Sequence, residues 1–132
     1  MNEVKVLQRL KHEHIVRYVD SFVSESGKLC ICMEWASGGD IGALLGAKKK
    51  AGGRFSEAEL IRMVWQMASA LSYCHHEVKL LHRDLKPANI FLDKRGEIKI
   101  GDFGISKVSW RVAGRDEDPC SHTEHGRELT RA

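Results

Sequence analysis

The first half of the chain changes from a helical pattern to a strand pattern and then to a glycine-rich stretch. In "MNEVKVLQRLKHE", Val4, Leu7 and Leu10 recur at helical spacing among charged residues, which predicts an amphipathic helix. "HIVRYVDSFV" alternates around β-branched residues, "SESGK" offers turn residues and "LCICME" is a short apolar run, so we expect an antiparallel hairpin. "WASGGDIGALLGAKKKAGGR" predicts a connector with a short helix near residues 40–45 and a solvated loop at the lysine run.

The clearest helical pattern begins at Ser56. Ser56 and Glu59 have the spacing of a capping box, in which each residue satisfies a backbone N–H of the other. Apolar residues then recur at i, i+4, i+7, i+8 and i+11, as Leu60, Val64, Met67, Ala68 and Leu71. We predict a long buried helix that ends near His76. After it, "IFLDKRGEIKI" predicts two short strands joined by the turn "DKRG".

Composition narrows the class of protein. A chain of 132 residues with 42% hydrophobic and 30% charged residues is typical of a soluble globular domain, and not of a disordered or fibrous protein. A net charge of +3 is too small for the basic face that nucleic-acid binding needs. Without an apolar run of about 18 residues or a secretion signal, we expect no membrane segment. The four cysteines contain no C-x-x-C pair, which favours reduced thiols and a cytoplasmic location, with nuclear or cytoskeletal association left open.

The chain changes character at about Ser109. Residues 109–132 are polar, carry both charge signs and have almost no apolar periodicity, so we expect a disordered or loosely attached tail beside a domain at residues 1–108. Cys120, His122 and His125 lie close together in this tail and raise a zinc hypothesis. A fourth ligand at suitable spacing is missing, so a tail without metal is the preferred interpretation.

Charged residues gather in "LLHRDLKPANIFLD" and "IKIGDFGISK", between apolar runs. Phosphoryl transfer requires a group that orients the attacking hydroxyl, oxygen ligands for Mg²⁺ and a cation beside the moving phosphate. Asp84 has the chemistry of the first group and Lys86 that of the cation. Asn89 and Asp102 carry the hard oxygen atoms that Mg²⁺ prefers. These two strings therefore contain every kind of residue that phosphoryl transfer needs.

The same strings resemble the eukaryotic protein kinase family. "HRDLKPAN" is similar to the catalytic loop H-R-D-L-x-x-x-N, and "DFG" follows a predicted strand pair, as in that family. Lys86 is similar to the serine/threonine branch, and "MEWASGGDI" with the two strings resembles NIMA-related kinases. The resemblance implies ATP-dependent, Mg²⁺-assisted phosphorylation of serine or threonine in a protein substrate.

The resemblance also implies a fold and further site residues. The fold is α+β: the end of an N-lobe (helix C, strands 4 and 5) and the start of a C-lobe (helices D and E, the catalytic loop, short strands 7 and 8). The nucleotide-binding residues that it implies are the helix C Glu3, the gatekeeper Met33, the hinge residues Glu34, Trp35 and Ala36, the ribose-side Asp40 and the adenine-floor Phe91. Four apolar or aromatic positions match the regulatory spine, and core packing explains them equally well: Leu7, Tyr18, His82 and Phe103.

The resemblance covers residues 1–108, less than half of a complete kinase domain. The sequence contains no G-x-G-x-x-G loop, no V-A-I-K lysine to pair with Glu3 and no A-P-E. We therefore expect a fragment with exposed apolar faces on the long helix and on the spine residues, and negligible phosphoryl transfer by the chain alone. The alternative is a non-catalytic binding module. The presence of Asp84, Asn89 and Asp102 is evidence against it. A small-molecule phosphotransferase is disfavoured by the form "RDLKP". The sequence leaves the oligomeric state open.

Overall fold

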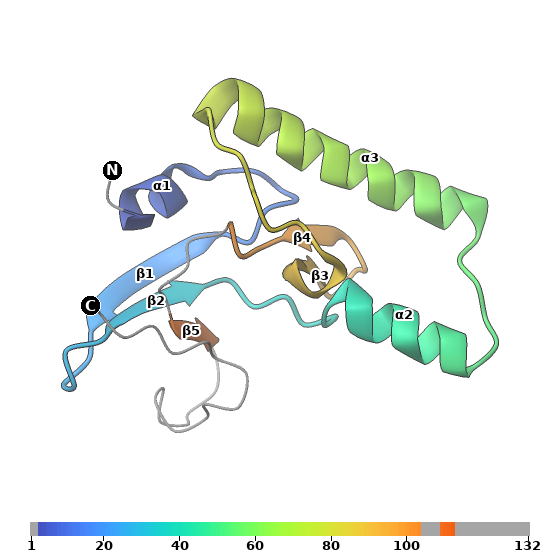
Figure 1. Cartoon of the computed structure of the whole chain (residues 1–132), viewed down its shortest axis with the longest axis horizontal. Helices are drawn as coiled ribbons and strands as arrows, with labels where there is room; N and C mark the ends of the chain where they lie inside the picture. The colour runs from blue at the N-terminus through green and yellow to red at the C-terminus, as the bar shows by residue number, and fades with distance from the viewer. Residues whose placement is uncertain (1–2, 104–108, 113–132) are drawn as a thin grey trace.

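The computed structural model describes residues 3–103 and 109–112. It contains three α-helices in this part of the chain: α1 (Glu3–Arg9), α2 (Ile41–Lys50) and α3 (Glu57–Tyr73). The strands are β1 (Tyr18–Val23), β2 (Leu29–Met33), β3 (Ile90–Leu92), β4 (Ile98–Ile100) and β5 (Ser109–Val112). They form two small sheets, in the orders β1-β2-β5 and β3-β4 (Figure 1). The predicted α+β class is confirmed.

The predicted hairpin is formed by β1 and β2. The two strands are antiparallel, with pairs from Tyr18↔Met33 to Val23↔Leu29. The turn between them closes where the N–H of Ser24 donates to the carbonyl of Lys28 at 2.8 Å. Cys30, Ile31 and Met33 of β2 are buried, so the hairpin ends with its last residue in the core.

The outer edge of β2 pairs with β5. The pairing is parallel and runs from Cys30↔Ser109 to Met33↔Val112. The four residues of β5 thus form a strand, whereas the sequence predicted a disordered or loosely attached tail. The strand pairs with β2, which lies far upstream in the chain, and a local sequence pattern does not reveal such a partner. Residues 104–108 and 113–132, with the predicted domain boundary and the zinc candidates Cys120, His122 and His125, lie outside the described residues.

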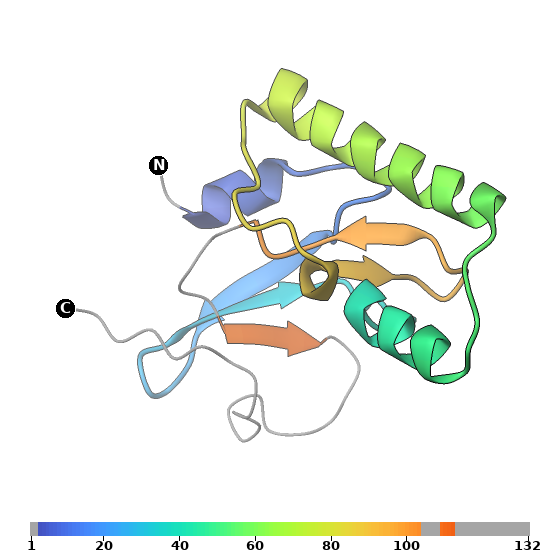
Figure 2. The same ribbon diagram turned by 45° about the vertical axis from the view of Figure 1, so that its right-hand side comes forward.

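The second sheet is the predicted pair of short strands. Ile90↔Ile100 and Leu92↔Ile98 are antiparallel partners. In the turn, Asp93 N–H donates to the carbonyl of Glu97 at 2.9 Å. Ile98 and Ile100 are completely buried, because β3 and β4 lie between α3 and α2 (Figure 2). Backbone hydrogen bonds from β4 to residues 14–16 then connect this sheet to the segment that precedes β1.

The long helix α3 begins with the predicted capping box. The Ser56 hydroxyl accepts a hydrogen bond from the Glu59 N–H at 3.2 Å, and Ser56 N–H donates to the Glu59 carboxylate at 2.7 Å. A π-helical turn, Cys74–Val78, follows α3 and ends at Lys79, whose φ of 58° is left-handed. The predicted end near His76 is therefore confirmed within this turn.

The buried stripe predicted for α3 is partly wrong. Leu60 and Val64 are 48% and 59% exposed, whereas Gln66 and Ala70 are buried. The helix is apolar on two faces, and the face with Met67 and Ala70 packs against the core that includes β4. The opposite face, here called the outer face of α3, is largely exposed: Leu60, Ile61, Val64 and Trp65. The Trp65 ring lies at its border, with its centroid 6.2 Å from that of the His14 ring.

Two further expectations on exposure have different outcomes. The exposed apolar face predicted for the long helix is confirmed by the outer face of α3. The exposure predicted for the spine positions is wrong for Leu7, His82 and Phe103, which are each no more than 5% exposed, whereas Tyr18 is partly exposed. Leu7 and Phe103 belong to the hydrophobic core, and the His82 ring packs on Phe103.

The lysine run was predicted as a loop but lies in α2. Asp40 caps the N-terminus of this helix, where its Oδ1 accepts from the N–H of Ala43 at 2.8 Å. Lys48, Lys49 and Lys50 form the last turn, where the helix dipole favours positive charge. The helix is therefore longer than the residues 40–45 that the sequence predicted.

Cys30, Cys32 and Cys74 form no disulfide among the described residues. Burial raises the pKa of the Cys74 thiol to about 11, so this thiol stays protonated near neutral pH. Each helix in the described part of the chain is too short or too polar to cross a membrane.

We expect the outer face of α3 to drive self-association of the isolated chain. The double variant Ile61→Lys/Trp65→Lys should lower the average mass measured by light scattering, because it places charges on exposed apolar positions. It should change the free energy of unfolding by no more than about 0.5 kcal/mol per site, as is typical of surface positions.

The matched control is Ala70→Lys, on the packed face of the same helix, where the side chain is 0% exposed. It should abolish the helical circular dichroism signal, because a lysine charge cannot be buried there without a partner. Loss of helix in the Ile61→Lys/Trp65→Lys variant would contradict the assignment of the two faces.

Candidate active site

Three residues of the predicted catalytic set meet in the loop between α3 and β3. Lys86 Nζ donates to the Asp84 carboxylate at 2.6 Å. The Asn89 Nδ2 amino group donates to the Asp84 carbonyl at 2.8 Å and to the Asp84 carboxylate at 3.2 Å. Asn89 is buried in a 3₁₀ turn, Pro87–Asn89, while the Asp84 side chain remains 43% exposed. The loop therefore holds its base candidate in place and leaves it accessible from outside.

His82 connects this loop to the segment after β4. The imidazole is buried, and its Nε2 lies 2.8 Å from the Gly101 carbonyl oxygen. Because a carbonyl oxygen only accepts, Nε2 carries the proton, and Nδ1 is then free to accept from the N–H of Asp84 at 3.3 Å. The ring also packs on Phe103, with 4.7 Å between the ring centroids. The tautomer with its proton on Nε2 thus makes both hydrogen bonds, to Gly101 and to Asp84.

Asp102 follows in an unusual backbone conformation. Its φ is 51°, in the left-handed region that few residues other than glycine adopt and that aspartate tolerates better than most. The residue before it, Gly101, donates its N–H to the Asn89 carbonyl at 2.9 Å. A Cβ at Gly101 would lie only 2.9 Å from the ring of Phe91, so a glycine is needed at this close approach. The hydrogen bond from Gly101 therefore holds the backbone of Asp102 close to Asn89.

The oxygen atoms at this point fit a magnesium ion. The Asn89 amino group is used as a donor, which leaves the amide oxygen able to accept or coordinate. The Asp102 carboxylate has no hydrogen-bonded partner among the described residues. Within this same set, no group of three His, Cys, Asp or Glu residues could hold a metal ion. One carboxylate with an amide oxygen suits Mg²⁺, which keeps several waters and binds through substrate phosphates.

The segment after β2 offers backbone groups to a flat ligand. Met33 is 4% exposed, Ala36 is 9% exposed and Trp35 is 55% exposed. Among the described residues, no hydrogen bond uses the backbone of Trp35 or Ala36. The N–H of Glu34, in contrast, donates to the Arg17 carbonyl at 2.8 Å. The available N–H groups in the predicted hinge are therefore those of Trp35 and Ala36.

The predicted Asp40 and Phe91 are brought beside this segment by β3. The carbonyl of Leu92 accepts from the N–H of Gly38 at 2.8 Å, and Asp40 and Phe91 form an isolated antiparallel bridge. Phe91 is half-buried. The Asp40 carboxylate is partly committed, because one of its oxygens caps α2. Phe91 thus pairs with Asp40 and lies against Gly101.

One predicted site residue has no described side chain, and one charged contact near the site was not predicted. Glu3 lies at the start of α1, and its side chain is outside the described residues, so its predicted role stays a prediction. Sequence reasoning missed Lys99, whose Nζ donates to the Glu34 carboxylate at 2.8 Å. The only local signal was a lysine between two buried isoleucines of β4.

Comparison with known proteins finds a matching sequence profile and several similar proteins. A sequence profile described as protein kinase domain matches residues 1–117. A probable serine/threonine-protein kinase nek2 of Dictyostelium discoideum is 42% identical over 111 residues, which cover 82% of this chain and 27% of that protein. Human serine/threonine-protein kinase Nek2 is 38% identical over 113 residues (82% and 25%), and mouse Nek1 is 43% identical over 106 residues (80% and 8%). The chain spans about a quarter of the length of the two Nek2 proteins.

We expect His82→Leu to lower the free energy of unfolding by about 1–3 kcal/mol, because the buried Gly101 carbonyl loses its donor. The midpoint of urea unfolding measures this change. His76→Leu, at an exposed histidine of the π-helical turn, is the matched control and should have little effect. Equal stability of the two variants would show that the His82 contact does not hold the loop.

Proposed function

Because this chain belongs to the protein kinase family and is similar to NIMA-related serine/threonine kinases, we propose that it forms the nucleotide-binding and phosphoryl-transfer centre of a protein serine/threonine kinase. One observation carries the proposal. The loop with Asp84, Lys86 and Asn89 is fixed against the Gly101–Asp102 segment by the buried His82 and by the Gly101–Asn89 hydrogen bond. Phosphoryl transfer depends mainly on such positioning.

In this proposal Asp84 orients the hydroxyl of a serine or threonine and accepts its proton. Its side chain is 43% exposed, so a protein substrate can reach it. Lys86 Nζ lies 2.6 Å from the Asp84 carboxylate, which puts a positive charge beside the reacting hydroxyl. This charge stabilises the negative charge on the transferred phosphoryl group. Asn89 fixes Asp84 through two hydrogen bonds from its amino group.

The nucleotide site in this proposal has a base end and a metal end. The backbone groups of Trp35 and Ala36 bind the adenine edge, and Phe91 forms the floor beneath the ring. Asn89 and Asp102 hold Mg²⁺ at the other end through their oxygen atoms. The metal, when bound, neutralises charge on the ATP phosphates. The protein substrate and the expected cytoplasmic location stay predictions.

A second candidate function is a non-catalytic binding module. The outer face of α3, with Ile61 62% exposed and Trp65 63% exposed, favours it, because apolar patches of this kind mark interaction sites. A module of this type needs no nucleotide. Binding of Mg·ATP therefore separates the two candidates.

We expect Mg·ATP to stabilise the chain against thermal unfolding, since a ligand that binds only the folded state stabilises it by mass action. At a concentration ten times Kd the stabilisation is about 1.4 kcal/mol. Asp102→Asn should abolish the part of the shift that depends on Mg²⁺, because it removes the carboxylate ligand. Differential scanning fluorimetry with ATP, with and without Mg²⁺, measures both effects.

The matched control for this change is Asp20→Asn, the same substitution at an exposed position of β1. It should keep the full shift. A wild-type chain that Mg·ATP does not stabilise would favour the binding-module function, and an unchanged shift in Asp102→Asn would remove Asp102 from the metal site.

A further inference from the structure

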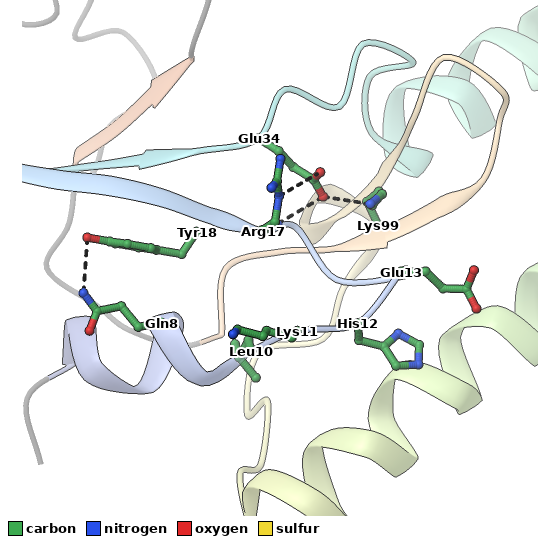
Figure 3. Close-up of a pocket in the computed structure, with 9 residues that line it drawn as sticks. All are labelled: Gln8, Leu10, Lys11, His12, Glu13, Arg17, Tyr18, Glu34 and Lys99. Atoms are coloured by element: carbon green, nitrogen blue, oxygen red, sulfur yellow. Dashed lines mark hydrogen bonds and ion pairs between the residues drawn. The ribbon is translucent and has the colours of Figure 1, made fainter.

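A half-buried ion pair lies behind the hinge segment. Lys99 Nζ donates to the Glu34 carboxylate at 2.8 Å, and the two side chains are only 17% and 22% exposed. The same carboxylate accepts from the N–H of Arg17 at 3.1 Å, and the Arg17 Nε lies 4.0 Å from its second oxygen (Figure 3). Glu34 is thus held by three groups, and its partner Lys99 lies 65 residues further along the chain.

The ion pair lines a cavity of about 660 Å³ that is separate from the candidate active site. Figure 3 shows the residues around it, which come from α1, the segment between α1 and β1, the start of β1, the segment after β2, and β4: Gln8, Leu10, Lys11, His12, Glu13, Arg17, Tyr18, Glu34 and Lys99. Glu34 is the only one of them that also belongs to the predicted nucleotide-binding set. Its carboxylate is directed to Arg17 and Lys99, so this side chain forms the ion pair with Lys99, here called the bridge.

Both residues of the bridge are close in sequence to residues of the proposed nucleotide site. Glu34 is followed by Trp35 and Ala36, which have the available backbone groups of the hinge. Lys99 pairs with Phe91 across the second sheet and is followed, three residues later, by Asp102. The bridge therefore joins the base end of the proposed site to the strand that carries its metal end.

The surroundings make this contact stronger than an ordinary surface ion pair. Exposed pairs contribute little because water and salt screen them. Here both partners are largely covered, and a backbone N–H adds a charge-assisted hydrogen bond to the carboxylate. Removal of one partner would leave the other charge half-buried without compensation, and the two segments would separate to solvate it.

We propose that Lys99 and Glu34 are positioning residues, whose bridge sets the separation between Trp35–Ala36 and Asp102 so that one nucleotide can engage both ends. This inference rests on the proposed function, because it needs a nucleotide that spans the two segments. Neither side chain touches the nucleotide in this arrangement. The bridge acts only through the backbone that it holds.

Charge reversal in the full chain tests the bridge. Lys99→Glu and Glu34→Lys should each weaken Mg·ATP binding about tenfold, within the range of coupling between residues in contact. The double reversal should restore the affinity to within about threefold of the wild type, and Lys99→Arg should keep it. Isothermal titration calorimetry with Mg·ATP measures the four affinities.

Arg62→Glu is the matched control. Arg62 makes a 3.2 Å ion pair with Glu97 between α3 and the turn before β4, outside both ends of the nucleotide site. Its reversal should leave the affinity unchanged. The proposal is overturned if Lys99→Glu binds Mg·ATP like the wild type, if the double reversal fails to recover affinity, or if Arg62→Glu weakens binding equally.

Amide hydrogen exchange without nucleotide separates this inference from the proposed function. Lys99→Glu should speed exchange both at residues 35–36 and at residues 101–103, and the double reversal should slow it again at both places. A change at one end alone would refute the coupling. A wild-type chain that fails to bind Mg·ATP would refute the proposed function, and the exchange result would still decide whether the bridge couples the two segments.

Discussion

The imidazole of His82 is the contact on which the candidate site depends. It donates to the carbonyl of Gly101, accepts from the N–H of Asp84 and packs on Phe103, all from a buried position. The loop before β3 and the segment after β4 would otherwise be joined mainly by the hydrogen bond between Gly101 and Asn89. A buried polar side chain with both nitrogens satisfied restricts the geometry more than apolar packing does, because hydrogen bonds are directional. The relative position of the Asp84 and Asp102 backbones therefore depends mainly on this ring.

A second buried polar side chain, Gln66, positions α3 against the sheet of β3 and β4. The Gln66 amide oxygen accepts from the N–H of Ile98 at 3.0 Å, and its amino group donates to the Glu97 carboxylate. This contact fixes the rotation of α3 about its axis. The apolar residues on the opposite side are consequently directed outward, whatever their hydrophobicity. Polar contacts in the core thus decide which of two apolar faces is buried.

Local patterns in the sequence predicted most of the elements, and contacts between distant residues explain what they missed. The capping box at Ser56 and both hairpins depend on residues a few positions apart, so their chemistry is visible in the sequence. The orientation of α3 depends on Gln66 and Ile98, 32 residues apart, and periodicity cannot choose between two apolar faces. Asp84, Lys86 and Asn89 were predicted because their spacing is a motif. The bridge between Glu34 and Lys99 joins residues with no common pattern, and only the folded chain brings them together.

The left-handed backbone at Asp102 narrows the amino acids that this position can accept. Conformational energy there favours glycine, asparagine and aspartate, since a β-branched or bulky side chain is strained at a φ of 51°. The magnesium site proposed above would require a negatively charged ligand here, which is aspartate or glutamate. The two requirements arise from unrelated physics, and aspartate is the only residue that meets both. Variation at this position is therefore limited by the backbone as well as by the reaction, so a glutamate that preserved the charge would still be a poor replacement.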